Sequence, residues 1–225
     1  YPYINFKYDR EIGNDILFVE NLTKEGYFEN LSFTVGREDK IGIVGRNSKA
    51  ISVLYDVLMG KETADSGYYK WGKTITPTYL PVDNDEYFVG CDLSLVDWLS
   101  RYSYDHYEEF VRGWLARMLF SGEESQKKAS VISGGEKVRC MLAKMMLEGG
   151  NFMILDEPTN HLDLESITAL NDGLVAFKGC LLMTSHDREL MNTVCNRIIE
   201  IDGGKKVYDR PVDYDTYLEE TMNKQ

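Results

Sequence analysis

Short apolar runs with the character of β-strands alternate with segments of helical period along most of this chain. In its first third, these runs lie at residues 16–22, 31–35, 40–44, 65–72 and 74–81. Between the third and the fourth run, residues 52–60 place their apolar side chains on one helical face. An apolar strand, a short polar loop and an amphipathic helix in this order are typical of an α/β domain.

The alternation returns after residue 132. Helical patterns lie at 136–148, 165–177 and 189–195, and β-like runs lie at 151–157, 180–185, 197–202 and 205–209. Because most of these runs are apolar throughout, they predict a mostly parallel sheet that helices cover on both faces. Residues from about 91 to 132 are helical and rich in aromatic side chains, and we expect them to form a short inserted helical lobe.

The two ends of the chain differ from this interior. Residues 1–15 are polar, with scattered aromatic side chains and no period, which indicates the end of a linker, and residues 16–215 form the predicted domain. Residues 216–225 are expected to be a C-terminal tail. Tyr1 is neither a start methionine nor the head of a signal peptide, so we expect a piece of a longer protein. No apolar run reaches the roughly 18 residues of a membrane helix, and no membrane contact is predicted.

Composition narrows the possible functions. Asp and Glu number 37 against 25 Lys and Arg, and the net charge of −12 argues against direct binding of a nucleic-acid backbone by this surface. The four cysteines lie far apart, without the pairing of a metal site or the density of a disulfide scaffold. They predict buried free thiols in a soluble protein of the reducing cytoplasm.

The first candidate site is the stretch GRNSKAISV at residues 45–53, which follows the apolar run IGIV. A phosphate-binding loop reads G-x-x-x-x-G-K-[ST] and lies between a strand and a helix. Gly45 and Ser52 match this pattern, whereas Ala50 and Ile51 replace the second glycine and the lysine. The stretch is therefore a nucleotide site, a former nucleotide site or a chance match.

Three further motifs lie in the second half of the chain. The run FMILDE ends in Asp156 and Glu157, and in phosphate-loop enzymes such a strand delivers a carboxylate to magnesium. Solvated acids at the edge of a strand are the alternative. SGGE at residues 133–136 precedes a helix, where glycines allow an oxyanion to approach and the helix N-terminus points N–H groups at it. His186 follows the apolar strand LLMTS, from which its ring could reach the same pocket.

In this order the motifs resemble the ATP-binding cassette family, over about residues 16 to 210. The string EPTNHLD, the short lobe and SHDREL are most similar to the ABC-F branch, whose members carry two cassettes on one polypeptide, lack a membrane domain and mostly act on ribosomes. Residues 1–15 resemble the end of the linker between those cassettes, which would make this chain the second, C-terminal cassette. The resemblance implies an α/β phosphate-loop NTPase fold with a mostly parallel sheet, a small antiparallel β subdomain and a short inserted helical lobe.

The resemblance also implies the cofactors ATP and Mg²⁺ and a role for each motif. Ser52 and Asp156 would bind magnesium, Glu157 would orient the attacking water as the catalytic base, and His186 would sense the γ-phosphate. The nucleotide-binding residues would be Gly45, Asn47, Ser48, Lys49, Ala50, Ile51, Ser52 and Val53, and the signature that closes over the partner cassette's ATP would be Ser133, Gly134, Gly135 and Glu136. Without the family pattern, Glu157 would be a helix-capping acid and His186 a satisfied histidine at a strand end.

This chain departs from the family pattern in its phosphate loop. Ser48 and Ala50 stand where the family has glycine, and their β-carbons hinder the close approach of phosphates. Ile51 replaces the lysine, which forfeits roughly 1.5 to 3 kcal/mol of charge-assisted bonding, or about ten- to a hundredfold in affinity. Lys49 is a candidate substitute, although its stem leaves the loop in a different direction. Val82 replaces a glutamine that links magnesium to the lobe.

Aromatic and apolar side chains have simpler interpretations. The hairpin that presents an aromatic ring to adenine in the family is short here, which leaves Tyr27 or Phe28 as candidates. Apolar residues at helical spacing predict core positions, with a contact to a partner or a ribosome as the alternative for some of the lobe aromatics. These predicted core residues are Val138, Met141, Leu142, Met145 and Met146, together with Trp98, Phe110, Trp114 and Phe120 in the lobe.

Three functions remain open from the sequence. The leading hypothesis is a cytoplasmic ATPase cassette that ATP clamps against a second cassette on the same polypeptide, with hydrolysis releasing the clamp during work on translation. The second is a regulatory cassette with an inert pocket that supplies its signature to the neighbour. The third, disfavoured by EPTNHLD and the short lobe, is the ATPase subunit of a transporter. The isolated domain is expected to be a monomer or a weak dimer, and any ribosome contact is expected through other segments.

Overall fold

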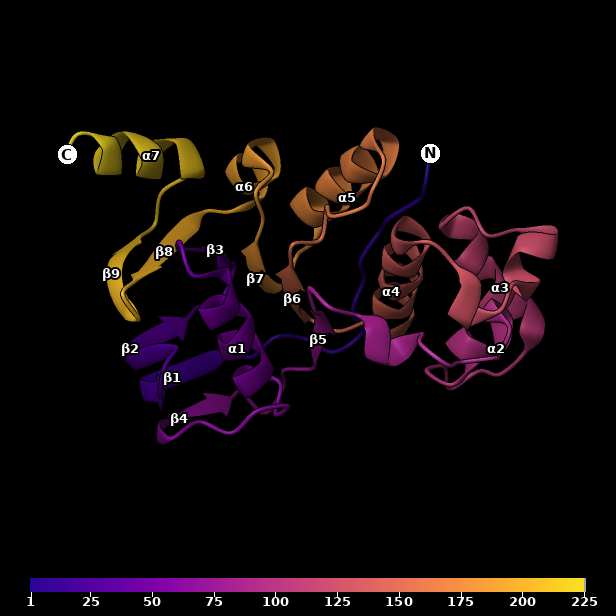
Figure 1. The fold of residues 1–225 in the computed structure, drawn as a ribbon, viewed down its shortest axis with the longest axis horizontal. Coiled ribbons are helices and arrows are strands. Elements are labelled where there is room, and N and C mark those ends of the chain that lie inside the picture. Colours follow the sequence, from indigo (N-terminus) through magenta and orange to yellow (C-terminus); the bar gives the residue numbers. More distant parts are fainter. Residues whose placement is uncertain (225) are drawn as a thin grey trace.

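Strands form two sheets over residues 1–224, the part of the chain that the computed structural model describes (Figure 1). The larger sheet consists of β5 (Pro77–Leu80), β6 (Phe152–Asp156), β7 (Cys180–Thr184), β3 (Lys40–Val44), β8 (Arg197–Asp202) and β9 (Lys205–Arg210), in this order. Its neighbours run parallel except β8 and β9. The smaller, antiparallel sheet consists of β2 (Phe28–Val35), β1 (Leu17–Lys24) and β4 (Ser66–Trp71). This arrangement confirms the predicted fold class.

Side chains of the larger sheet alternate between two hydrophobic cores. On β6, Phe152 and Ile154 face the core that contains helix α1 (Ser48–Leu58) and the smaller sheet. Met153 and Leu155 face the core that contains helices α4 (Gly134–Glu148), α5 (Leu164–Ala176) and α6 (Arg188–Val194). A strand buried on both faces needs apolar residues throughout, which explains why its sequence shows no alternation. The helices are α1 (Ser48–Leu58), α2 (Leu95–Ser100), α3 (Glu108–Arg117), α4 (Gly134–Glu148), α5 (Leu164–Ala176), α6 (Arg188–Val194) and α7 (Tyr214–Met222).

The inserted helical lobe, with α2 and α3, lies at one end of the molecule in Figure 1. Trp98 and Phe120 are fully buried in it, as predicted. Phe110 is 43% exposed, so the prediction of a core position is wrong for this residue, and Trp114 is only partly buried. The predicted stripe on α4 is buried, and it consists of Val138, Met141, Leu142, Met145 and Met146.

Residues 1–15 contain no helix or strand and pack against the core. Ile4 and Phe6 are both buried. Ile4 lies against α5 at Gly173, where a β-carbon would come within 2.7 Å of Ile4 Cγ2. The Phe6 ring contacts the Phe177 ring edge-on, with 6.2 Å between centroids. The segment expected as the end of a linker is therefore seated on the domain.

Hydrogen bonds hold this segment near both of its ends. The Tyr3 N–H donates to the Arg117 carbonyl at 2.8 Å, at the end of α3 in the lobe. Arg10 Nη2 donates to the Lys73 carbonyl at 2.7 Å, in the connection between β4 and β5. The segment thus connects the lobe to the edge of the smaller sheet.

The chain after residue 215, which was expected to be a tail, contains most of helix α7. Asp213 caps this helix, because its side chain accepts a hydrogen bond from the Thr216 N–H at 2.8 Å. Tyr217 is 8% exposed, and its hydroxyl donates to Glu200 on β8. The expected boundary after residue 215 therefore falls inside a packed helix. Gln225, the last residue of the expected tail, lies outside the described residues.

Two predictions from composition can be compared with the structure. The four cysteines are free, and Cys140, Cys180 and Cys195 are buried as expected, whereas Cys91 is partly exposed. Among the helices of residues 1–224, none combines the length and the hydropathy needed to cross a bilayer.

Candidate functional site

The carboxyl ends of three neighbouring parallel strands bring the candidate residues together. β6, β7 and β3 are adjacent in the larger sheet and run in the same direction (Figure 1). Asp156 ends β6, His186 follows β7, and Gly45 follows β3. In open α/β sheets, ligands bind at this edge. Motifs that are far apart in the sequence therefore meet in one place.

The phosphate-loop stretch is helical from Ser48 onward. Asn47 caps α1, and its side-chain oxygen accepts a hydrogen bond from the Ala50 N–H at 3.1 Å. The Ile51 N–H donates to the Asn47 carbonyl at 3.4 Å. A loop that cradles phosphates needs these N–H groups to point at the ligand. In this chain the N–H groups of Ala50 and Ile51 are engaged within the first turn of α1.

Side chains at the phosphate end of the site differ in their exposure. Ala50 is 2% exposed and Ile51 is 1% exposed, and Ile51 belongs to the core between α1 and the smaller sheet. Ser48 and Lys49 are exposed to solvent. Gly45 is also exposed, but a β-carbon there would collide with the Ile201 carbonyl oxygen. The phosphate end therefore lacks two glycines and the lysine of the family pattern, while Gly45 retains the bare backbone that close packing requires.

The proposed magnesium ligands are in direct contact. Ser52 Oγ donates a hydrogen bond to Asp156 Oδ2 at 2.5 Å, and Asp156 is 3% exposed. Burial raises the pKa of Asp156 to about 6, the Ser52 hydrogen bond opposes this rise, and the nearby charges of Glu157 and Asp56 add to it. Hydroxyl and carboxylate oxygens suit Mg²⁺, which keeps water and phosphate oxygens as its other ligands. Within residues 1–224, no cluster of three or more His, Cys, Asp or Glu side chains could hold a metal by itself.

Glu157 is held in a left-handed conformation, with φ 52°. Its N–H donates to the Thr184 carbonyl at 2.7 Å, and its Oε2 accepts from the His186 N–H at 3.2 Å. His186 Nε2 lies 3.2 Å from Glu157 Oε1, but this buried oxygen accepts no hydrogen bond of good geometry from the described part of the chain. Burial raises the pKa of Glu157, and the neighbouring His186 opposes the rise. A buried carboxylate with one free oxygen is suited to accept a proton from water.

The signature residues form the start of helix α4. Ser133 caps the helix, since its Oγ accepts from the Glu136 N–H at 3.2 Å, and Glu136 Oε1 accepts in return from the Ser133 N–H at 3.1 Å. A β-carbon on Gly135 would lie 2.5 Å from the His161 carbonyl oxygen, and one on Gly134 would lie 3.1 Å from the His161 ring. The two glycines thus allow the helix start to contact the loop after Glu157. Ser133 and Gly134 are exposed.

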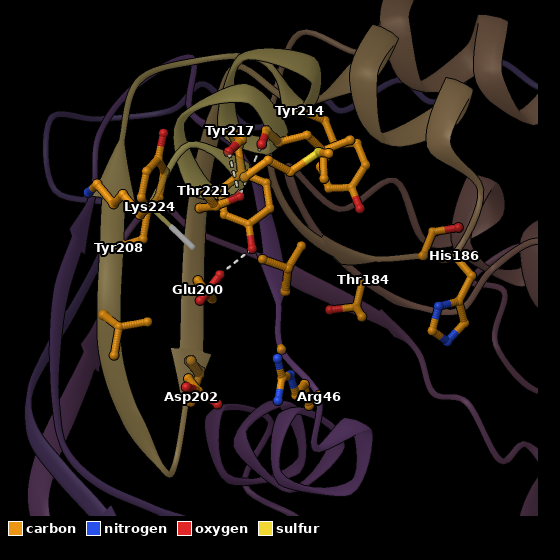
Figure 2. Close-up of a pocket in the computed structure, with 17 residues that line it drawn as sticks. Arg46, Thr184, His186, Glu200, Asp202, Tyr208, Tyr214, Tyr217, Thr221 and Lys224 are labelled. Carbon is orange, nitrogen blue, oxygen red and sulfur yellow. Dashed lines mark hydrogen bonds between the residues drawn. The ribbon is translucent and has the colours of Figure 1, made fainter.

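A cavity of about 540 Å³ opens between the strand ends and α7 (Figure 2). Its lining includes Arg46 and His186 from the candidate site, Glu200 of β8 and Tyr217 of α7. Figure 2 shows the Tyr217 hydroxyl directed at Glu200, above the start of α1. Sequence reasoning missed the contribution of α7, although an aspartate suited to a helix start precedes this helix.

The two candidates for stacking on adenine differ in their accessibility. Phe28 is 3% exposed and belongs to the core around α1 and the smaller sheet, so its proposal as a stacking residue is wrong. Tyr27 is partly buried and lies beside the turn between β8 and β9, where the Glu29 N–H donates to the Gly204 carbonyl at 2.8 Å. Only Tyr27 retains a partly accessible ring.

A profile of the ABC transporter family matches residues 28–160. An uncharacterized ABC transporter ATP-binding protein, YkpA of Bacillus subtilis, is 58% identical over 224 residues, which are 97% of this chain and 41% of that protein. The probable ATP-binding protein YbiT of Escherichia coli O157:H7 is 38% identical over 96% of this chain and 42% of its own length. The energy-dependent translational throttle protein EttA of Mycobacterium tuberculosis is 34% identical over 85% of this chain and 36% of its own length.

Solved structures are similar in fold. The ATP-binding cassette MJ0796, a dimer in a post-hydrolysis state bound to ADP and Pi, has a TM-score of 0.73 at 14% identity, over 88% of this chain and 99% of that chain. CbiO1 of Clostridium perfringens, part of an ABC transporter complex, has a TM-score of 0.68 at 19% identity, over 94% of each chain. The chain spans about two fifths of the length of the curated relatives YkpA and YbiT.

Proposed function

Because the chain belongs to the ABC transporter family, we propose that it is the second ATP-binding cassette of an ABC-F ATPase that acts on the ribosome during translation. Support comes from the relative EttA, an energy-dependent translational throttle protein by name. YkpA and YbiT are more than twice as long as the aligned part, which leaves room in those proteins for another cassette. The net charge of −12 favours ribosomal contact through other segments than this chain.

Within the pair, the proposed role of this chain is to supply its signature residues to the ATP of the other cassette. The observation that carries this proposal is the altered start of α1, where Ser48 and Ala50 carry β-carbons and Ile51, which is buried in the core, offers a phosphate no donor. The start of α4 instead presents exposed Ser133 and the bare backbone of Gly134. Glycines at a helix start let an anion approach the N–H groups there closely.

The remaining residues of the chain's own site favour a second candidate function, in which both composite sites hydrolyse ATP. Bound Mg-ATP would supply the phosphoryl group and the cation that neutralises its charge. Ser52 and Asp156 would hold the cation, and their oxygens are already in contact. Glu157 would accept the proton of the attacking water, because its Oε1 is free and its pKa is raised by burial. His186 lies beside that oxygen.

The test uses the full-length protein that carries this chain, measured with and without ribosomes. Ser133→Asp and Ser133→Asn both keep a side chain that caps α4, but only aspartate adds a negative charge beside a bound phosphate. If the chain supplies its signature to the other site, Ser133→Asp lowers ATP turnover at least about tenfold and Ser133→Asn by less than about threefold. Glu157→Gln then changes turnover by less than about twofold.

The reverse order of effects would support hydrolysis in the chain's own site. That outcome is a large loss of turnover in Glu157→Gln and little change in Ser133→Asp. Sedimentation of the ATP-bound protein with ribosomes tests the proposed partner. Recovery with membranes instead of ribosomes would contradict the ribosomal role and favour a transporter subunit.

A further inference from the structure

Helix α1 contacts the ends of two neighbouring strands through hydroxyl groups on one of its faces. Ser52 and Tyr55 are three residues apart, so their side chains lie on the same side of the helix. The Ser52 hydroxyl bonds to Asp156 at the end of β6 at 2.5 Å. The Tyr55 hydroxyl bonds to Thr184 Oγ1 at the end of β7 at 2.6 Å. These two hydrogen bonds therefore fix the ends of β6 and β7 relative to α1.

The number of hydroxyl protons decides which residue donates the hydrogen bond between Tyr55 and Thr184. Thr184 Oγ1 also lies 2.7 Å from the Ile43 carbonyl oxygen, on β3 just before the phosphate loop. A carbonyl has no proton to give, so the single Thr184 hydroxyl proton goes to Ile43. Tyr55 must then donate to Thr184. Tyr55 is fully buried, and burial raises its pKa well above the usual value, so it keeps the proton that it donates.

The backbone of Thr184 continues this chain of contacts to Glu157. The Thr184 carbonyl accepts the Glu157 N–H at 2.7 Å, and the His186 N–H bonds to Glu157 Oε2 at 3.2 Å. Glu157 has φ 52°, a conformation that a residue with a β-carbon adopts only when its surroundings hold it. Thr184 and His186 thus hold the backbone and the carboxylate of Glu157, respectively.

We propose that Tyr55 is a positioning residue for Glu157, acting through Thr184. Its hydroxyl fixes the end of β7 against α1 and β3, and the Thr184 carbonyl in turn holds Glu157 in its left-handed conformation. The altered phosphate loop makes such support valuable, because Ile51 offers a bound phosphate no donor. That Glu157 serves as the base rests on the second candidate function, whereas the contacts from Tyr55 to Glu157 do not.

The test is amide hydrogen exchange of this chain, followed by NMR in the absence of nucleotide. Tyr55→Phe removes the hydroxyl and keeps the ring, so we expect the Glu157 amide to exchange about tenfold faster. Tyr79→Phe is the matched control, because the Tyr79 hydroxyl donates to Asp56 on the same helix at 2.8 Å. That control should leave the Glu157 amide within about twofold of the parent rate.

Substitutions of Thr184 separate positioning from general loss of stability. Thr184→Ser keeps the hydroxyl and should keep the slow exchange of Glu157, whereas Thr184→Val should reproduce the effect of Tyr55→Phe. The proposal is overturned if Tyr55→Phe leaves the Glu157 amide unchanged, or if Tyr79→Phe accelerates it equally. Equal acceleration of all core amides would also overturn it, since that indicates global destabilisation. Because no nucleotide is present, the result is independent of whether the chain turns over ATP.

Discussion

The starts of α1 and α4 are two helix N-termini of one chain, and the family pattern assigns phosphate contacts to both. Each is capped by a side chain, Asn47 in α1 and Ser133 in α4. They differ in the residues after the cap. In α4 two glycines follow the cap, whereas in α1 the exposed Ser48 and Lys49 follow it, and the next two residues, Ala50 and Ile51, are buried. The comparison teaches that a capping side chain is enough to begin a helix. Glycines after the cap are needed as well if an anion is to approach the helix N–H groups closely.

The largest expected effect concerns the carboxylate that α1 touches. Burial raises the pKa of Asp156 from 3.8 to about 6, so the folded state binds a proton more tightly than the unfolded state. Stability is therefore lost as the pH rises from about 4 to about 6, by up to about 3 kcal/mol. Asp156→Asn should remove this loss and be more stable than the parent at pH 7, as measured by urea unfolding across this pH range.

Glu136, at the start of α4, supplies the matched control for this titration. Burial acts to raise its pKa, but hydrogen bonds from Ser133 and Lys127 outweigh burial and lower the pKa. Its folded-state contribution is therefore present above the unfolded pKa and is lost as the pH falls through the folded pKa. Glu136→Gln should destabilise the chain at pH 7, and a gain of stability in both variants would contradict the contrast between the two helix starts.

Repair of the α1 start is expected to have the next largest effect. The triple variant Ser48→Gly, Ala50→Gly, Ile51→Lys restores bare backbone and a cation, and should raise the affinity for Mg-ATP about ten- to a hundredfold, or roughly 1.5 to 3 kcal/mol. Calorimetric titration of the parent and the variant measures the difference. An unfolding curve is needed beside it, because Ile51 is buried and a lysine there costs core packing.

The double variant Ser48→Gly, Ala50→Gly distinguishes the effect of removing two β-carbons from the effect of adding a cation. It should gain less affinity than the triple variant, because it retains Ile51. Micromolar binding by the parent chain, with little gain on repair, would mean that the altered helix start tolerates ATP. The contrast between α1 and α4 would then not describe nucleotide affinity.

The smallest expected effect concerns the caps themselves. Asn47→Ala and Ser133→Ala should each lower the free energy of unfolding by about 1 kcal/mol, because each removes one acceptor for a helix N–H. Thermal or urea unfolding of the two variants measures this directly. Similar losses would sharpen the comparison by showing that the helix starts differ only beyond the cap. A loss confined to one helix would show that the caps are not equivalent.

The sequence predicted the fold well where burial acts on whole segments. β6 and β7 are buried on both faces, and their uninterrupted apolar sequence indicates this directly. Helix α7 was missed because its apolar positions are few and polar residues surround them, although Asp213 is a regular helix-start signal. The prediction for Phe110 was wrong because helical spacing shows which face of a helix is apolar but not how much of that face a small lobe covers.

For the site, the sequence predicted which motifs share an edge of the sheet but not how they touch. The order of strands and motifs placed Asp156 and His186 at strand ends. The contact between Tyr55 and Thr184 joins residues 129 positions apart and depends on the relative height of α1 and β7. The left-handed conformation of Glu157 could not be predicted, because such backbone is usually recognised from a glycine and this position is a glutamate. Such details follow from packing, which residue spacing does not record.

The seating of residues 1–15 gives this chain a mechanical property. Tyr3 is bonded to the lobe, Ile4 lies in the notch at Gly173, and Arg10 is bonded to the connection before β5. A force applied at the N-terminal end is thus delivered first to the lobe and only then, along the segment, to the smaller sheet. Tension on residues 1–15 would therefore act on the lobe before it acts on the smaller sheet.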